Sequence, residues 1–190
     1  MLRTEGLTVT FGEKTVISGF SHDFPEGGTT VILGGSGSGK TTLINALAGA
    51  LQPAAGKVIN DNKTVSRVFQ EDRLIPSYTS LKNLTCVGIS EQKAWRYLEK
   101  TEIADAAGKR PGELSGGMKR RLALARALAF DAELYLFDEP LSGLDPDTAI
   151  RMARLIRAEL EGKTAVIVTH NEEAARIMAT AGTVRLEPPQ

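Results

Sequence analysis

One glycine-rich segment constrains the fold of this chain more than any other feature of its sequence. The segment reads GGSGSGKTT over residues 34–42, between an apolar run and a helical pattern at residues 41–48. Its spacing, Gly34-x4-Gly39-Lys40-Thr41, fits the phosphate-loop (P-loop) pattern, in which a strand precedes the loop and a helix follows it. A flexible Gly/Ser turn is the alternative, but it gives no role to the lysine and hydroxyl that follow in register. We therefore predict a strand, a phosphate-binding loop and a helix in that order.

Four short apolar runs predict the main sheet. They occupy residues 30–33, 67–69, 134–137 and 165–168. Each is typical of a strand that is buried on both faces, and helical patterns separate most of them. Strands that alternate with helices form a mostly parallel sheet with right-handed crossovers. The predicted fold class is therefore α/β, a P-loop NTPase with a mostly parallel sheet flanked by helices.

Two segments outside this alternation predict smaller parts of the fold. Residues 7–11 alternate apolar and polar side chains and are followed by an extended run at residues 15–20, which indicates an N-terminal antiparallel β subdomain. Residues 71–113 contain no strong strand and carry a helical pattern over residues 91–107, so we predict a short helical insertion. At 190 residues the chain has the usual size of one domain, which we expect to span residues 1–190 with the insertion inside it.

Polar or glycine-rich residues follow each of the four apolar runs. The P-loop follows the first run, Gln70 the second, Asp138 and Glu139 the third, and Thr169 and His170 the fourth. In open α/β sheets, ligands bind outside the carboxyl ends of the strands. We therefore expect these residues to converge on one crevice.

The residue types at these strand ends suit phosphate chemistry. Backbone N–H groups of the loop and the helix N-terminus attract phosphates, Lys40 would reach the terminal phosphates, and the Thr41 hydroxyl would ligate Mg²⁺. Asp138 would hold Mg²⁺ through water, and Glu139 would orient or deprotonate the water that attacks the γ-phosphate. An exposed Asp-Glu-Pro turn is the alternative, disfavoured because two adjacent carboxylates must be hydrated or paired.

Three residues have more evenly balanced interpretations. His170 is either a solvated loop residue or a contact to the γ-phosphate and the attacking water, and its place after a buried strand favours the second. The Gln70 amide can touch both Mg²⁺ and a water, although polar residues at strand ends are common. Phe11 can offer a flat face to adenine, but its alternation with other apolar residues makes core packing the default interpretation.

The segment LSGGMKRRLALARAL at residues 114–128 places two glycines directly before a long helical pattern. Ser115, Gly116 and Gly117 can simply begin the helix, with the serine as its N-cap. Alternatively, their bare backbone amides must come close to something negatively charged. The residues alone leave both interpretations open.

Charge and composition narrow the range of partners. Lysine plus arginine equals aspartate plus glutamate at 23 each, so no basic field points to nucleic acid, and we predict no nucleic-acid partner. Cys86 is the one cysteine and cannot form an internal disulfide. No segment resembles a signal peptide and no run of about 18 apolar residues occurs, so we expect a soluble, cytoplasmic chain.

Taken together, these motifs resemble the nucleotide-binding subunit of an ATP-binding cassette (ABC) transporter. GGSGSGKTT resembles the P-loop (Walker A) of that family, VFQEDR its glutamine loop, LSGGMKRRLALARAL its signature, LYLFDEPLSGLD its magnesium and dimer loops, and VTH its histidine switch. The resemblance runs from about residue 7 to residue 172 in the order of the family, and LSGG is its most specific motif. VFQEDRLIP together with LSGGM is most similar to importer subunits for nitrate, sulfonate and taurine-type anions.

The resemblance implies an ATPase that uses ATP and Mg²⁺. The implied catalytic residues are Lys40, Gln70, Glu139 and His170, and the implied metal ligands are Thr41, Gln70 and Asp138. The resemblance also makes Phe11 an adenine-stacking residue. The implied ATP-binding residues are Phe11, Gly34, Gly35, Ser36, Gly37, Ser38, Gly39, Lys40, Thr41 and Thr42.

The resemblance also implies partners. Ser115, Gly116 and Gly117 would face the γ-phosphate of an ATP held by a second cassette, and Asp145 would lie at the seam of this homodimer or cassette heterodimer. The dimer would power a transmembrane permease, most simply an importer of a small solute, from the cytoplasmic face of the cell membrane. A soluble cassette ATPase acting on DNA or ribosomes is the rival, but such proteins usually carry a coiled coil or tandem cassettes. A plain P-loop kinase would leave LSGG without a role.

Overall fold

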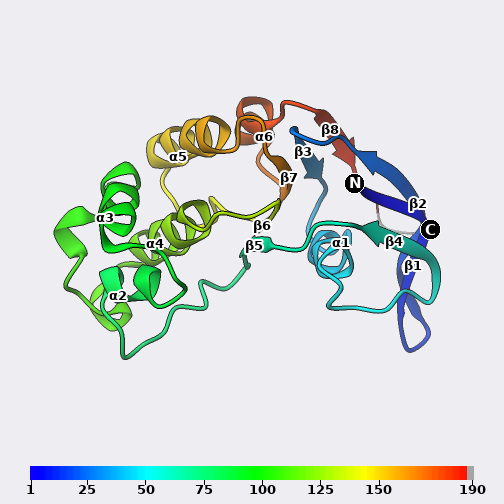
Figure 1. The fold of residues 1–190 in the computed structure, drawn as a ribbon. Helices are drawn as coiled ribbons and strands as arrows, with labels where there is room; N and C mark the ends of the chain where they lie inside the picture. Colours follow the sequence, from blue (N-terminus) through cyan, green and yellow to red (C-terminus); the bar gives the residue numbers. More distant parts are fainter. Residues whose placement is uncertain (188–190) are drawn as a thin grey trace.

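The structure is a computed structural model in which residues 1–187 are described, and the last three residues of the predicted domain, 188–190, lie outside the described residues. Parallel strands occupy the middle of the molecule (Figure 1). Three antiparallel strands lie at one end and a group of helices at the other, with a pair of further helices along the top. The helices are α1 (Lys40–Leu47), α2 (Ser80–Thr85), α3 (Glu91–Lys100), α4 (Gly116–Ala129), α5 (Pro146–Glu159) and α6 (Glu172–Met178).

The central parallel sheet has the strand order β5-β6-β7-β3-β8. Its strands are β3 (Thr29–Leu33), β5 (Val65–Val68), β6 (Leu134–Asp138), β7 (Thr164–Thr169) and β8 (Gly182–Arg185). Every residue of β3, β6 and β7 is buried, as expected for central strands that are covered on both faces. The predicted α/β fold class with a mostly parallel sheet is confirmed.

The two faces of this sheet pack against different layers. Along β6, Leu134 and Leu136 join a core cluster with α1 and the antiparallel strands. Tyr135 and Phe137, which alternate with these leucines along the strand, join a second cluster with α4, α5 and α6. Successive side chains of a strand point to opposite faces, so one short run supplies both cores.

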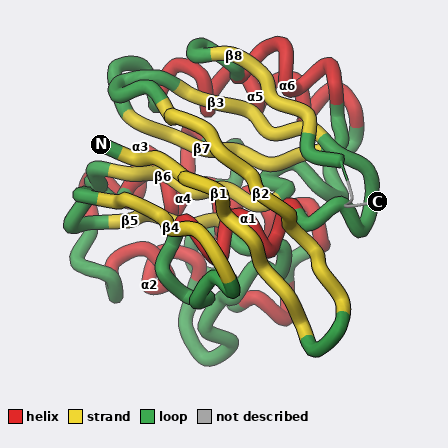
Figure 2. The backbone as a smooth tube through the Cα atoms, turned by 90° about the vertical axis from the view of Figure 1, so that its right-hand side faces the viewer, coloured by secondary structure: helices red, strands yellow, loops and turns green. Residues whose placement is uncertain are grey.

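The predicted N-terminal antiparallel subdomain is a three-stranded sheet of order β2-β1-β4. Its strands are β1 (Leu2–Phe11), β2 (Lys14–Phe24) and β4 (Ala55–Asn60). Figure 2 shows β1, β2 and β4 in front, with α5 and α6 beyond the strands of the parallel sheet. At Gly56 the backbones of β4 and β1 approach so closely that a Cβ atom would lie 2.2 Å from the Gly6 carbonyl oxygen. Only glycine fits this crossing.

The edges of both sheets differ from the sequence-based prediction. The run at residues 67–69 is not a strand buried on both faces, because β5 covers Val65–Val68 at the edge of the sheet and alternates half-buried and buried residues. Strands β4 and β8 were not predicted. Both lie at sheet edges and contain no buried residue, so their sequences carry little apolar signal.

The predicted helical insertion is helical only in part. No helix or strand covers residues 69–79, and regular structure begins with α2 at Ser80. The helical pattern over residues 91–107 divides into α3 and a 3₁₀ turn at Ala104–Ala106. Helix α3 ends because Glu102 adopts a φ of 59° and the Ile103 N–H reaches back to the Leu98 carbonyl oxygen at 2.9 Å. This is the bond of a Schellman cap.

None of the helices within residues 1–187 has the length and the apolar character that a membrane crossing needs.

Candidate active site

The P-loop connects β3 to α1, as predicted. A Cβ atom on Gly34 would lie 2.4 Å from the Ser38 Oγ, and Gly37 and Gly39 have φ angles of 79° and 91°. The tight turn therefore requires glycine at several positions. Gly39 is the N-cap of α1 and provides no side-chain cap. The first N–H groups of this helix can therefore bind an anion, which the helix dipole also attracts.

Lys40 lies at the mouth of this loop with only 8% of its surface exposed. Its ammonium donates to the carbonyl oxygens of Gly34 at 2.7 Å and Gly35 at 2.9 Å. It also lies 3.7 Å from the Glu139 carboxylate. These contacts hold the charge beside the loop, where a bound phosphate can take their place.

Contacts with the end of β7 hold Glu139 in place, and the sequence did not predict these contacts. Its φ of 47° is costly for a residue with a side chain, by roughly 1–3 kcal/mol. Its N–H donates to the Val168 carbonyl oxygen at 2.9 Å. Its Oε1 lies 2.9 Å from Nδ1 of His170, and its Oε2 accepts the Thr169 hydroxyl at 3.0 Å. Two neighbouring residues at the end of β7 therefore orient this carboxylate.

Thr169 is a site residue to which the sequence assigned no role. Its Oγ1 accepts the Asn171 N–H at 3.1 Å, so its hydroxyl hydrogen is free to donate to Glu139. The side chain is buried at 2% exposure. The available signal was its place at the end of a buried strand, next to His170.

Asp138 is buried at the end of β6, with 3% of its surface exposed. Burial raises the pKa of this carboxyl, against the opposing effect of the Thr41 hydroxyl and the Lys40 charge. Its Oδ1 is buried and has no hydrogen-bond partner among residues 1–187. A buried carboxylate oxygen without a partner is an unfavourable arrangement for packing alone, and it suits a hard cation such as Mg²⁺ or a water bound to one.

The oxygen donors expected to hold Mg²⁺ fit such an ion. Thr41, Gln70 and Asp138 line the same cleft and offer a hydroxyl, an amide and a carboxylate. Within residues 1–187, no group of three His, Cys, Asp or Glu side chains could hold a metal by itself. Magnesium usually binds through one or two protein oxygens, phosphate oxygens and waters, so this sparse donor set is appropriate.

The cleft that contains these residues has a volume of about 640 Å³. It brings together residues from the P-loop, α1 and the ends of β5, β6 and β7. The predicted site residues along its walls are Ser36, Gly37, Gly39, Lys40, Thr41, Thr42, Gln70, Asp138, Glu139 and His170. Lys14, Val16 and Ser142 also line it and were not predicted, because only tertiary packing brings β2 and the loop after β6 to this edge.

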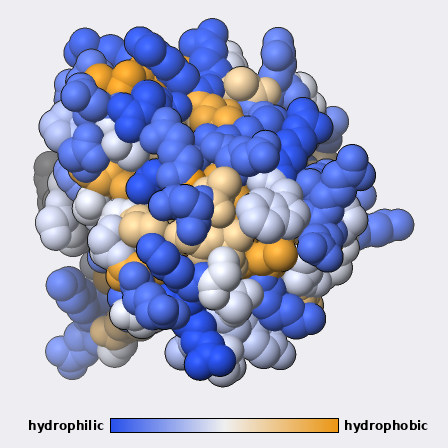
Figure 3. All heavy atoms as spheres, turned by 90° about the vertical axis from the view of Figure 1, so that its left-hand side faces the viewer, coloured by the Kyte–Doolittle hydropathy of each residue, from blue (hydrophilic) through white to orange (hydrophobic). Residues whose placement is uncertain are grey.

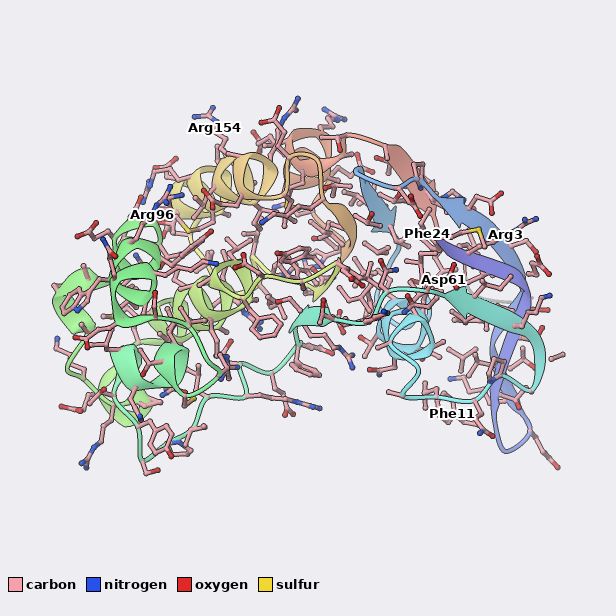
Figure 4. The ribbon with its side chains drawn as sticks, viewed as in Figure 1. Arg3, Phe11, Phe24, Asp61, Arg96 and Arg154 are labelled. Atoms are coloured by element: carbon pink, nitrogen blue, oxygen red, sulfur yellow. The ribbon has the colours of Figure 1, made fainter. Side chains whose placement is uncertain are left out.

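Phe11 lies at the end of β1 beside the β1–β2 turn, 53% exposed (Figure 4). It does not line the cleft itself, but its strand partner Lys14 does. The default interpretation of Phe11 as a core residue is therefore wrong. Its exposed ring is available to a flat ligand that enters past Lys14.

Ser115, Gly116 and Gly117 do not line this cleft. Ser115 and Gly116 are exposed at the start of α4, and the Ser115 Oγ caps the helix by accepting the Met118 N–H at 3.2 Å. The simpler of the two interpretations, a serine N-cap, therefore holds. It does not explain the exposed glycine that follows, where the backbone is open to a second molecule.

Asp145 has a local structural role at the start of α5. Its Oδ1 accepts the Thr148 N–H at 3.0 Å, and this hydrogen bond to the backbone lowers the pKa of the carboxyl. Asp145 is exposed and does not line the cleft.

Three features define the class of protein: a P-loop after β3, a buried aspartate at the end of β6, which is separated from β3 by β7, and a glutamate held beside the P-loop lysine. The parallel sheet presents all of them at its carboxyl edge. These are the parts that a nucleoside triphosphatase of the P-loop class needs for binding phosphates and positioning a water.

The chain belongs to the ABC transporter family, since a family model described as ABC transporter matches residues 17–142. The aliphatic sulfonates import ATP-binding protein SsuB 2 of Streptomyces avermitilis is 39% identical over 184 residues, covering 94% of this chain and 74% of that protein. The lipoprotein-releasing system ATP-binding protein LolD of Myxococcus xanthus is 36% identical over 189 residues, covering 86% and 84%.

Among solved structures, the post-hydrolysis dimer of the ATP-binding cassette MJ0796 bound to ADP and Pi has a TM-score of 0.88 and is 28% identical to this chain. The match covers 98% of this chain and 94% of that chain. The protein is therefore an ATP-binding cassette, and it hydrolyses ATP.

Proposed function

We propose that two cassettes close around two ATP molecules and drive a membrane permease that imports a small anionic solute. The observation that carries this proposal is the division of the site. Lys40, Asp138 and Glu139 line one cleft, whereas Ser115 and the exposed Gly116 lie outside it. A second chain can supply the missing contact to the γ-phosphate. The dimeric structure of the related cassette MJ0796 supports this arrangement.

In this proposal each residue of the cleft has one task. The N–H groups of the P-loop and α1 and the Lys40 ammonium bind the phosphates. Glu139 orients a water and accepts its proton, while His170 contacts the γ-phosphate on the exposed side. Thr41, Gln70 and Asp138 would hold Mg²⁺, and a bound Mg²⁺ would supply positive charge that offsets the negative charge of the phosphates. In the partner chain, the helix N-terminus at Ser115, Gly116 and Gly117 stabilises the same γ-phosphate.

Adenine recognition is proposed for the β1–β2 turn. The Phe11 ring is exposed and can stack on the base, while Lys14 and Val16 line the adjoining cleft. Stacking with few base-specific contacts tolerates other purine nucleotides.

The permease is proposed to dock on the insertion, because this part of the chain includes Gln70's loop and exposes apolar side chains. Ile75, Val87 and Trp95 are 37%, 40% and 39% exposed. Figure 3 shows the end of the molecule that carries the insertion, where apolar patches interrupt a polar surface. A partner bound here would move with the loop that contacts ATP. The chain would then bind at the cytoplasmic face of the membrane without entering it.

We infer the transported solute, an aliphatic sulfonate, from the names of similar proteins. Aliphatic sulfonate import proteins match 94% of this chain at 38% to 39% identity. Uptake of a labelled alkanesulfonate should fall in cells that lack this chain and return when the chain is supplied. Unchanged uptake would reject the sulfonate proposal, and co-purification with a lipoprotein-releasing membrane protein would support the second relative instead.

The dimer itself can be tested with Glu139→Gln, which should bind ATP but hydrolyse it slowly because the base is lost. We expect this variant to run as a dimer in size-exclusion chromatography with Mg-ATP and as a monomer with ADP. The matched control is Lys40→Ala in the same background, which should stay monomeric. Glu139→Gln that remains monomeric with saturating Mg-ATP would contradict the dimer.

A further inference from the structure

Arg120 is a buried arginine on α4 that the proposed mechanism does not use. It is 6% exposed, and its guanidinium points toward the segment after β5. Its Nη1 donates to the Phe69 carbonyl oxygen at 2.7 Å, and its Nη2 donates to the Gln70 carbonyl oxygen. Its Nε lies 3.3 Å from the Asp72 carboxylate. One side chain therefore contacts three residues of the segment 69–73, which we call the Gln70 loop.

The planar fork of arginine is required for this arrangement. Residues 69–73 form no helix or strand, so the carbonyl groups of Phe69 and Gln70 depend on side chains or water for hydrogen bonds. A guanidinium can donate to both at fixed geometry, whereas a lysine ammonium is a single point charge on a flexible stem. Burying an unpaired arginine would be costly, and Asp72 supplies the compensating charge.

Other contacts make the loop rigid around this attachment. The Arg126 guanidinium, further along α4, donates to the carbonyl oxygens of Asp72 at 3.2 Å and Arg73 at 3.0 Å. The guanidinium groups of Arg73 and Arg67 lie over the Phe69 ring, 3.9 Å and 4.4 Å from its centroid. The Gln70 loop is thus attached to α4 as a unit and should move with that helix.

Helix α4 also carries the exposed N-terminus at Ser115 and Gly116. From Ser115 to Arg120 the helix rises only about 7.5 Å, at roughly 1.5 Å per residue. Gln70 lines the cleft of its own chain, whereas Ser115 is exposed and does not line that cleft. One rigid element therefore connects a residue that senses ATP in its own chain to the surface proposed to contact ATP in the partner.

We propose that Arg120 is a positioning residue that couples the two ATP sites of the dimer, because it holds the Gln70 loop to helix α4. The coupling rests on the composite dimer proposed above. ATP in one cleft fixes Gln70, Arg120 transmits that position to α4, and Ser115 is then placed for the second ATP. Loss of the Arg120 contacts leaves each cleft able to bind ATP but weakens the coupling between the two sites, because within residues 1–187 only the Arg126 bonds to Asp72 and Arg73 then attach the loop to α4.

The test compares Arg120→Lys with Arg121→Lys in the full chain. Arg121 is the matched control because it too donates to two carbonyl oxygens, of Thr101 at 3.1 Å and Glu102 at 2.7 Å, but these lie at the C-terminal end of α3 and not in the Gln70 loop. The readout is the Hill coefficient of ATP hydrolysis, which can approach the number of sites, about 2, when two sites are coupled. ATP binding by the monomer, measured by calorimetry, reports whether each variant is folded.

Arg120→Lys should reduce the Hill coefficient from near 2 toward about 1, while monomer binding stays within about twofold of wild type. Arg121→Lys should keep the wild-type coefficient. Asp72→Asn, which removes only the ion pair, should give an intermediate Hill coefficient. This variant replaces Arg120→Lys in the test if Arg120→Lys does not fold. A wild-type coefficient in both Arg120→Lys and Asp72→Asn would overturn the coupling role and leave the dimer intact. A coefficient of about 1 in the wild-type chain, together with a monomeric Glu139→Gln variant, would instead overturn the dimer and the coupling with it.

Discussion

At the scale of single residues, the Glu139 carboxylate depends on its neighbours at the end of β7. His170 contacts one oxygen and Thr169 the other, so the carboxylate cannot rotate freely. The side chain of His170 is 68% exposed, whereas Thr169 is buried. The buried contact is therefore the more constant of the two, because water can replace an exposed hydrogen bond.

Thr169→Val keeps the shape of this side chain and removes the hydroxyl. We expect the rate constant of ATP hydrolysis at saturation to fall roughly tenfold, since a hydrogen bond to a charged group is worth about 1.5 kcal/mol or more. The KM for ATP should stay nearly unchanged, because Thr169 orients the base and does not bind phosphate. Thr169→Ser should retain most of the rate in the same steady-state assay. A Thr169→Val variant with full activity would show that Glu139 does not need this contact.

The sequence predicted the residues of the site that belong to local motifs and missed those that tertiary packing adds. Lys40 and Thr41 were found because the spacing of the P-loop fixes their positions relative to one turn and one helix. Lys14 and Val16 carry no such signal, because they reach the cleft only through the packing of β2 on α1. The sequence also did not predict the hydrogen bonds of Arg120, because they depend on how α4 is rotated relative to the Gln70 loop.

At the scale of helices and strands, the central strands were predictable and the edges were not. Strands β3, β6 and β7 are buried on both faces and read as continuous apolar runs. Strands β4, β5 and β8 lie at the edges of their sheets. An edge strand has a neighbouring strand on one side only, so it needs fewer apolar residues. Helix α3 ended earlier than its pattern because Glu102 adopts a left-handed conformation, which its residue type does not predict.

The insertion is attached to α5 through Glu159. Tyr97 on α3 donates to its Oε2 at 2.6 Å, and Lys100 pairs with its Oε1. Burial alone would raise the pKa of Glu159, but the bonds from Lys100 and Tyr97 outweigh it, and the net pKa is lowered. A carboxyl whose pKa is lower in the folded state stabilises the fold above its unfolded pKa and loses that contribution as the pH falls.

Glu159→Gln should therefore lower the free energy of unfolding by about 1 to 2 kcal/mol at pH 7, measured by urea denaturation. The difference from wild type should narrow as the pH falls from the ordinary glutamate pKa of 4.5 through the lowered value in the folded state. Asp131→Asn is the control, because Asp131 pairs with Lys93 while 84% of its side chain is exposed, and should change little. A deficit that is equal at pH 7 and at pH 4 would contradict the ionic role of Glu159.

At the scale of the whole molecule, one chain presents half of each proposed site on two different surfaces. In the proposed dimer, the cleft at the carboxyl edge of the sheet supplies Lys40, Asp138 and Glu139, and the N-terminus of α4 would complete the site of another chain. Two-fold symmetry satisfies both surfaces at once, because each copy gives what the other lacks. In this proposal, binding of ATP would drive closure and hydrolysis would permit opening, so that the reaction in the cleft would move the insertion.

Occlusion of ATP by mixed dimers tests this composite site most directly. In a Glu139→Gln background, chains carrying Lys40→Ala cannot hold ATP, and chains carrying Ser115→Arg hold ATP but block the partner's γ-phosphate. Each variant alone should occlude no nucleotide after rapid removal of free ATP. An equal mixture should occlude more ATP than either variant alone, with a ceiling of one ATP per mixed dimer, because one of its two sites pairs an intact Lys40 with an intact Ser115. A mixture that retains no more ATP than the separate variants would contradict a site shared between two chains.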